Sequence, residues 1–212
     1  MWIFLRKMIT NKGLKSENIE QLNHSIWLGK QSFRIALIAT FSALSIVLGY
    51  ALAYIPNIEL FTLMIFLSGF IMGKKDGLLI GLLSAAIFTF LNPLGISPLP
   101  LFAYQLFHYS LTGFTGGITR IYLNRKDFFK PQEDLYHIKI VILFALIGAV
   151  LTFTYDILST LFGGFIVSFT IQYFIVTYFS GMIFTTIHLV GNILGFIFIL
   201  PGLIQLILKL LD

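Results

Sequence analysis

Long apolar runs with only short polar connections between them are the feature that most limits how this chain can fold. The runs cover residues 33–55, 58–73, 77–91, 100–122, 139–161 and 179–200. A helix needs about 20 apolar residues to cross the hydrocarbon core of a bilayer. With 58% of its residues hydrophobic and 11% charged, a soluble domain of this size could not keep so much apolar surface from water. The sequence therefore predicts an all-α integral membrane protein with six transmembrane helices.

The segments around these runs carry their own signals. The runs 58–73 and 77–91 are short and would need burial among neighbouring helices. The stretch 162–178 is apolar but interrupted by a Gly pair and Gln172, which predicts a re-entrant or interfacial connection. The loop 92–100 holds three of the six prolines, so we expect a stiff, Pro-rich outer loop between the third and fourth helices. Pro201 should break or kink the last helix.

The distribution of basic residues predicts the orientation. All 14 Lys and Arg residues lie before or at the start of the first run, between runs two and three, between or beside runs four and five, or after run six. Because Lys and Arg are retained on the cytoplasmic side, we expect a multi-pass protein of the cell membrane with both termini in the cytoplasm. Residues 1–32 contain no signal-peptide core and form a cytoplasmic segment, in solution or along the membrane surface. The net charge of +5 thus reports topology and does not indicate nucleic-acid binding.

Several kinds of chemistry find no support in the sequence. The chain has no Cys, which removes disulfides and thiolate nucleophiles. It has no GxSxG, no GxxxxGK[ST] and no HExxH motif, so we nominate no catalytic residue, expect no cofactor or metal, and infer that the chain does not hydrolyse ATP by itself.

Polar side chains in the outer half of the predicted membrane region are the candidate functional residues. Seven of the nine acids, Asp76 among them, fall in cytoplasmic segments where solvation accounts for them, whereas Glu59 and Asp156 do not. Stripes of polar residues spaced by three or four follow three helices: Gln105, His108 and Thr112; Thr152, Asp156 and Thr160; and His188 with Asn192. Ionisable groups are expensive in a membrane and usually face a cavity or one another. We therefore expect an outward-facing ligand pocket formed by Asn57, Glu59, Asn92, Gln105, His108, Asp156, His188 and Asn192.

Two other interpretations of these residues stay open. Glu59 and Asp156 could lie shallow enough to reach headgroup water, with the two histidines merely bonding between helices. A metal site formed by His108, His188, Glu59 and Asp156 is conceivable, although no established ligand spacing supports it.

Small residues line one side of the first run. Ala39 and Ala43 stand four apart, with Ala36 and Thr40 beside them. Such a small-xxx-small face lets another helix approach closely in lipid. It serves either internal packing or a partner protein.

Three parts of the sequence resemble the substrate-specific S component of energy-coupling factor (ECF) transporters, which are ABC importers. They are the block "PNIELFTLMIFLSGFIMGKKDGLLIGLLSAAIFTFLNPLGISPLP" at 56–100, the Ala39-xxx-Ala43 pair, and "GMIFTTIHLVGNILGFIFILPGLIQLIL" at 181–208. The resemblance implies a six-helix membrane domain over 33–208. It also implies a non-catalytic subunit that captures a vitamin or related micronutrient from outside and delivers it with a transmembrane T component and two cytoplasmic ATPases. Ala39 and Ala43 would face the T component.

The resemblance favours cobalamin as the ligand, whose faces Phe102, Tyr104, Tyr109, Phe165 and Tyr173 would contact. Riboflavin, pantothenate and a queuosine precursor remain alternatives. The first outer loop, "IPN", is shorter than in several members of the family, which argues against a lid there. Two rival functions are a self-sufficient ion- or proton-coupled carrier that uses Glu59 or Asp156, and an intramembrane enzyme with a metal between His108 and His188.

Overall fold

The computed structural model describes residues 30–92, 95–131, 134–165 and 170–211. Within these ranges all regular secondary structure is helical, in seven continuous helices. Most of the predicted cytoplasmic segment 1–32 lies outside the described residues, as do residues 93–94 of the Pro-rich loop.

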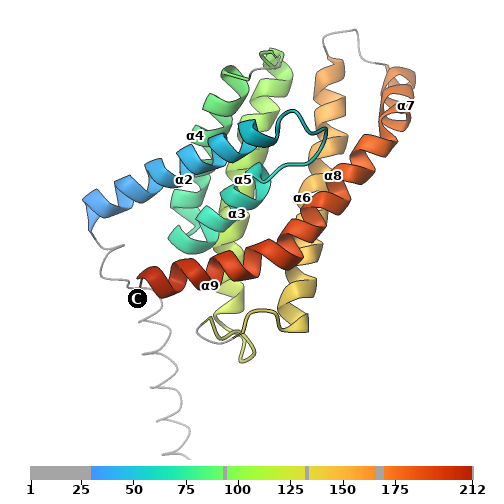
Figure 1. The fold of residues 1–212 in the computed structure, drawn as a ribbon. Coiled ribbons are helices and arrows are strands. Elements are labelled where there is room, and N and C mark those ends of the chain that lie inside the picture. Colours follow the sequence, from blue (N-terminus) through green and yellow to red (C-terminus); the bar gives the residue numbers. More distant parts are fainter. Residues whose placement is uncertain (1–29, 93–94, 132–133, 166–169, 212) are drawn as a thin grey trace, which may run out of the picture.

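Helices lie at all six apolar runs, with one further short helix. They are α2 Gln31–Leu52, α3 Phe61–Met72, α4 Lys74–Phe90, α5 Leu99–Leu123, α6 Ile138–Gly164, α7 Ile171–Ser180 and α8 Met182–Leu194, which continues through the π-helical turn η1 Gly195–Ile199 into α9 Leu200–Leu211. Figure 1 shows α5 and α6 running roughly together, with α2 and the α8–α9 helix crossing them obliquely.

Three of these helices are long and apolar enough to cross a membrane: α2, α6 and the continuous helix Met182–Leu211. The prediction of an all-helical fold is confirmed for the described residues, and the three long apolar helices fit a membrane protein. The prediction of six individual spans is not confirmed, because α3 has only 12 residues. At 1.5 Å per residue α3 is about 18 Å long, against a hydrocarbon core of about 30 Å.

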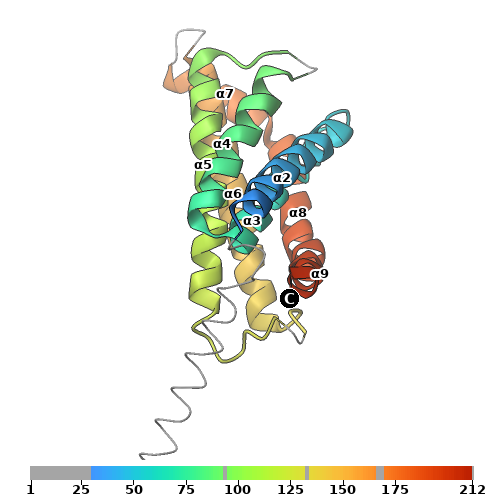
Figure 2. The same ribbon diagram turned by 90° about the vertical axis from the view of Figure 1, so that its left-hand side faces the viewer.

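The short helix α3 is instead the centre of the molecule. Every residue from Phe61 to Ile71 is buried, so α3 has no face left for lipid or water. Figure 2 shows it between α5 on one side and the α8–α9 helix on the other. Its Phe66 ring lies 5.2 Å from that of Phe196 in η1 and 6.3 Å from that of Phe144 in α6, measured between centroids. The expectation that this run needs burial among neighbours is confirmed.

Glycine lets α3, α4 and α5 approach until their backbones touch. A Cβ placed on Gly69 of α3 would collide with the backbone of Gly113 in α5, and a Cβ on Gly113 would collide with that of Gly77 in α4. Gly81 and Gly116 make the same kind of contact. Small residues at helix crossings maximise van der Waals contact where lipid provides no hydrophobic drive.

The helix α2 packs against this unit along one narrow face. Its buried residues are Phe41, Ser42, Ser45 and Gly49. At its N-terminal end, Arg34 makes two bonds to Asp76 of α4, Nε to Oδ2 at 2.6 Å and Nη2 to Oδ1 at 2.5 Å. The expectation that Asp76 is simply solvated is wrong, since it is buried and paired with a residue 42 positions away.

The opposite face of α4 is apolar and exposed. Its large exposed side chains are Leu78, Leu79, Leu82, Leu83, Ile87 and Phe90. Such a continuous apolar surface suits lipid chains, so membrane lipids would cover it.

The segment 162–178, predicted to be re-entrant or interfacial, contributes to two helices. Its first residues extend α6 to Gly164, and its end forms α7, a 10-residue helix with no buried residue. At about 15 Å, α7 is too short to cross the bilayer. Further on, the chain stays helical through Pro201, with the π turn just before it, and Figure 1 shows α8 and α9 running in different directions. A π turn is a recognised cause of such a bend, so the predicted kink is present.

The glycine contacts generate a stability prediction. Gly113→Leu should lower the unfolding midpoint in detergent, because the new side chain forces α5 away from α4 at a cost of about 1–3 kcal/mol or more. The matched control is Gly163→Ala in α6, where a Cβ meets nothing within 4 Å and helix propensity gains up to about 1 kcal/mol. Equal midpoints for the two variants would contradict the packing described for α3, α4 and α5.

Candidate functional site

Glu59 stands at the start of α3, where a short loop enters the molecule. Its Oε2 accepts the backbone N–H of Thr62 at 2.8 Å, which satisfies a donor in the first turn that has no partner within the helix. The carboxylate also lies at the positive end of the helix dipole. Two residues earlier, Asn57 adopts φ 59°, a left-handed conformation that Asn tolerates better than most residues. The loop therefore turns sharply and presents Glu59 toward α8.

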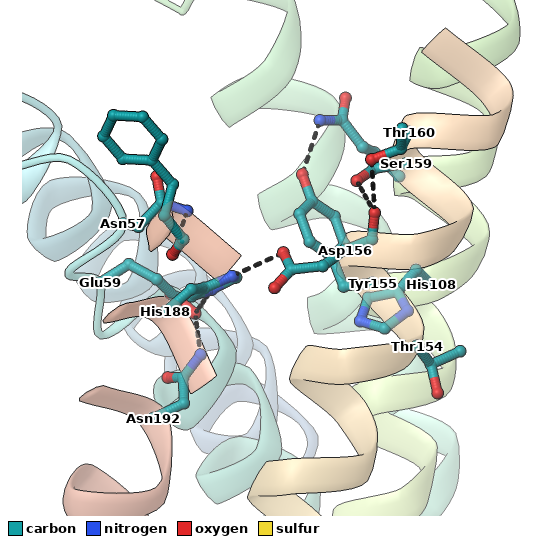
Figure 3. A network of polar contacts seen from close by, with 12 residues as sticks. Asn57, Glu59, His108, Thr154, Tyr155, Asp156, Ser159, Thr160, His188 and Asn192 are labelled. Carbon is teal, nitrogen blue, oxygen red and sulfur yellow. Dashed lines mark hydrogen bonds and ion pairs between the residues drawn. The ribbon is translucent and has the colours of Figure 1, made fainter. Parts of the chain in front are cut away.

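His188 of α8 lies between two carboxylates (Figure 3). Its Nδ1 is 2.8 Å from Asp156 Oδ1 on α6, and its Nε2 is 3.5 Å from Glu59 Oε1. One turn along α8, Asn192 donates from Nδ2 to the same Glu59 oxygen at 3.0 Å. His188, Asp156 and Asn192 are all buried. Four of the eight predicted site residues therefore form one network, contributed by three separate parts of the chain.

The contacts of His188 relate the charges of the three groups. If both carboxylates are ionised they only accept, so an imidazole that faces one with each nitrogen carries a proton on both. The species that satisfies this geometry is an imidazolium between two carboxylates, with a net charge of one negative unit. Removing His188 would leave two acids facing each other in a site with little solvent.

Tyr155 joins this network to α5. Gln105 donates from Nε2 to the Tyr155 hydroxyl at 3.0 Å. The Tyr155 ring centroid lies 5.1 Å from that of His108 and 6.0 Å from that of His188. Figure 3 shows the Asp156 carboxylate between His188 and Tyr155. Gln105 and His108, both predicted, thus border the network through a residue that was not predicted.

Aromatic side chains surround this junction. The Tyr104 hydroxyl lies 3.2 Å from His108 Nδ1 and 3.1 Å from the carbonyl of Thr154, and its ring stacks on Phe162 at 5.0 Å. Tyr109 is buried beside it. Of the rings predicted to contact a ligand, Tyr104 and Tyr109 lie here and Phe102 is half-buried, whereas Phe165 and Tyr173 are exposed.

The remaining predicted residues have other surroundings. Asn57 donates from Nδ2 to the carbonyl of Phe184 at 3.0 Å and so ties the loop to α8. Asn92 lies past the end of α4, where its carbonyl accepts the N–H of Gly95 at 3.0 Å. Thr112 and Thr160 donate to carbonyls one turn earlier in their own helices, a common use of Thr in helices. Thr112 and Thr160, both in the predicted polar stripes, therefore have structural roles within their own helices.

Tyr155 is the residue of the candidate site that the sequence did not indicate. The predicted stripe contains residues three and four apart from Asp156, and a neighbouring residue points about 100° away around the helix. It reaches the network because α5 packs on that side of α6. A Tyr beside a buried Asp was the one available signal, since a Tyr hydroxyl normally finds a partner when buried.

No group of three or more His, Asp or Glu side chains in the described part of the chain is arranged to hold a metal ion. In the network, both nitrogens of His188 already face carboxylates. The site is therefore described as a hydrogen-bonded polar cluster.

The small residues of the first run lie on the outside of α2. Ala36, Ala39, Thr40 and Ala43 are all exposed, while the helix packs inward through Phe41, Ser42, Ser45 and Gly49. Among the described residues, no other helix covers this face. Large apolar side chains flank it: Ile35, Leu44 and Val47 are 58%, 42% and 60% exposed.

Comparison of the chain with protein-family models, curated proteins and solved structures finds no match.

The buried network generates a second prediction. His188→Ala should lower the unfolding midpoint strongly, because removing the central partner leaves two carboxylates uncompensated at a cost of about 3 kcal/mol or more. Adding Asp156→Asn to this variant should raise the midpoint again, since one of the opposing charges is gone. Thr186→Ala, on the exposed side of α8, is the matched control and should change little. A double variant less stable than His188→Ala would contradict the charge assignment.

Proposed function

We propose that this chain is the substrate-binding membrane subunit of an ECF-type ABC importer. It captures a vitamin or related micronutrient from outside the cell. A T component and two cytoplasmic ATPases complete the transporter, and this chain contributes no catalysis. The observation that carries the proposal is the buried network of Glu59, Asp156, His188 and Asn192, which gathers costly polar groups at one point.

The topology proposed for this role has six membrane segments, with both termini inside. The helix α3 is the short second segment, held inside the bundle. The network lies toward the same end of α5 and α6 as the loop before Leu99, which carries no Lys or Arg and would be the outer face. The Pro-rich segment 92–100 would then cover the ligand from outside.

The exposed face of α2 supports the proposal that a T component is the partner. Ala39 and Ala43 offer a helix a close approach, and the large apolar side chains beside them would bury area on docking. The T component is a membrane protein, so its helices could reach this face within the bilayer.

One rival function is favoured by a particular observation. An imidazole between two carboxylates is a group that can exchange protons, as a self-sufficient proton-coupled carrier would need. The two functions differ in what drives uptake. In proteoliposomes, the importer subunit alone binds ligand without transporting it and gains ATP-dependent uptake only with the T component and ATPases. Uptake by the purified chain on a pH gradient alone would overturn the proposal.

The docking face generates the third prediction. Ala43→Trp should abolish co-purification with the T component and ATPases while leaving small molecules bound to the chain, because it fills only the outer face of α2. Val150→Trp is the matched control, since Val150 of α6 is 63% exposed on another helix. Mass spectrometry of the co-purified small molecules and the composition of the complex give the two readouts. Loss of both together, or loss of the complex in the control as well, would count against this docking face.

A further inference from the structure

Several buried polar atoms beside the network have no hydrogen-bond partner among the described residues, and they indicate which kind of ligand could bind there. Around Tyr155, four buried atoms have no hydrogen-bond partner among the described residues: Gln105 Oε1, His108 Nε2, Thr152 Oγ1 and Asp156 Oδ2. As whole residues, His108, Thr152 and Asp156 are 6%, 1% and 8% exposed. Unpaired buried polar atoms are costly and rare in native proteins, and several at one place call for a partner.

The hydrogen-bond network fixes the role of His108. The Tyr104 hydroxyl has one hydrogen and donates it to the carbonyl of Thr154 at 3.1 Å. The contact of 3.2 Å between His108 Nδ1 and this hydroxyl must then use a proton on Nδ1. In the neutral ring this leaves Nε2 as an acceptor. The tautomer follows from the bonds that the neighbouring groups make.

The unpaired atoms are therefore dominated by acceptors. Asp156 Oδ2 and Gln105 Oε1 can only accept, and His108 Nε2 accepts in this tautomer. The hydroxyl of Thr152 can do either. A ligand that satisfies this set has to bring several N–H or O–H donors.

The charge of the site also favours a ligand that brings hydrogen-bond donors. With both carboxylates ionised, even a protonated His188 leaves one negative charge uncompensated in this partly buried site. The rings of Tyr104 and Tyr109 lie 6.1 Å and 5.5 Å from that of Tyr155, measured between centroids, and aromatic rings attract cations. A positive ligand balances the charge and gains from the rings.

From these observations, and resting on the proposed function, we propose that the substrate is a small organic cation with several N–H donors, such as an amine-bearing aromatic heterocycle. One donor binds Asp156 Oδ2, and others bind Gln105 Oε1 and His108 Nε2. This chemistry differs from that of cobalamin, the ligand favoured by the sequence resemblance. It assigns Asp156 two tasks, with Oδ1 holding His188 and Oδ2 holding the ligand.

Compounds that share one ring system but differ in charge test the proposal. Pyridoxamine carries an aminomethyl cation where pyridoxine carries a neutral hydroxymethyl group and 4-pyridoxate a carboxylate. Thiamine is a second aromatic cation, and cyanocobalamin is the large alternative. Calorimetric titration of the full-length chain, purified in detergent and freed of bound small molecules, gives each Kd.

We expect pyridoxamine or thiamine to bind at least about tenfold more tightly than pyridoxine, pyridoxate and cyanocobalamin, the ratio that a charge-assisted bond supplies. Binding of neither cation overturns the proposal, as does a neutral or anionic compound that binds as tightly. Those results leave the proposed function intact, because assembly with the T component and ATPase-dependent uptake are measured separately. Binding of cyanocobalamin alone would restore the expectation from the sequence.

Two isosteric variants separate direct contact from overall charge. Asp156→Asn and Glu59→Gln each remove one negative charge, but only Asp156 has an unpaired oxygen, since Glu59 Oε1 bonds Asn192 and Oε2 bonds Thr62. Asp156→Asn should weaken cation binding by about tenfold more than Glu59→Gln does. Equal losses, or a larger loss in Glu59→Gln, would overturn the assignment of Oδ2. Gln105→Met, which removes another acceptor with little change in volume, should also weaken binding, and unchanged affinity there would overturn the role of Gln105.

Discussion

Backbone contact between α3, α4 and α5 is the constraint on which the rest of the structure depends. Gly69, Gly77 and Gly113 meet where any Cβ would collide with a neighbouring backbone, so these helices lie closer together than side chains would allow. Every residue of the short α3 from Phe61 to Ile71 is buried, so this helix needs no contact with lipid. Its buried start then fixes the place of Glu59. The polar site is a consequence of apolar packing.

The polar network and its unpaired neighbours have different physical meanings. Glu59, His188, Asn192 and one oxygen of Asp156 satisfy one another, which explains how charged groups persist in a mostly apolar bundle. The other oxygen of Asp156 lies buried with no partner among the described residues. In the proposed function, the satisfied groups hold the site in shape, and the unsatisfied ones bind the ligand.

The sequence predicted the helices well because apolar length is a local property. All six runs coincide with helices, and the spacing of His188 and Asn192 correctly placed both on one face. The shortness of run 58–73 indicated that it needs burial among neighbouring helices, but the sequence could not indicate the glycine contacts between separate helices that bury it. It also missed the pairing of Asp76 with Arg34, because a charge near a predicted helix end looks solvated until the tertiary partner is known. Tyr155 was missed because it lies next to Asp156 in the chain and so falls outside the stripe of residues three and four apart.

The inner side of α2 links the exposed small-residue face to the polar site. Gly49 lies against the rings of Phe61 and Phe88, where a Cβ would be 3.2 Å and 2.7 Å from their nearest atoms. Phe61 opens α3 and stands two residues after Glu59, and its ring also makes an edge contact with Tyr109 at 4.7 Å. Any change in how α2 packs must therefore shift Phe61 or open a void beside it, because close-packed rings cannot absorb the movement. The outer face of α2 and the carboxylate of Glu59 thus depend on one shared element, the first turn of α3.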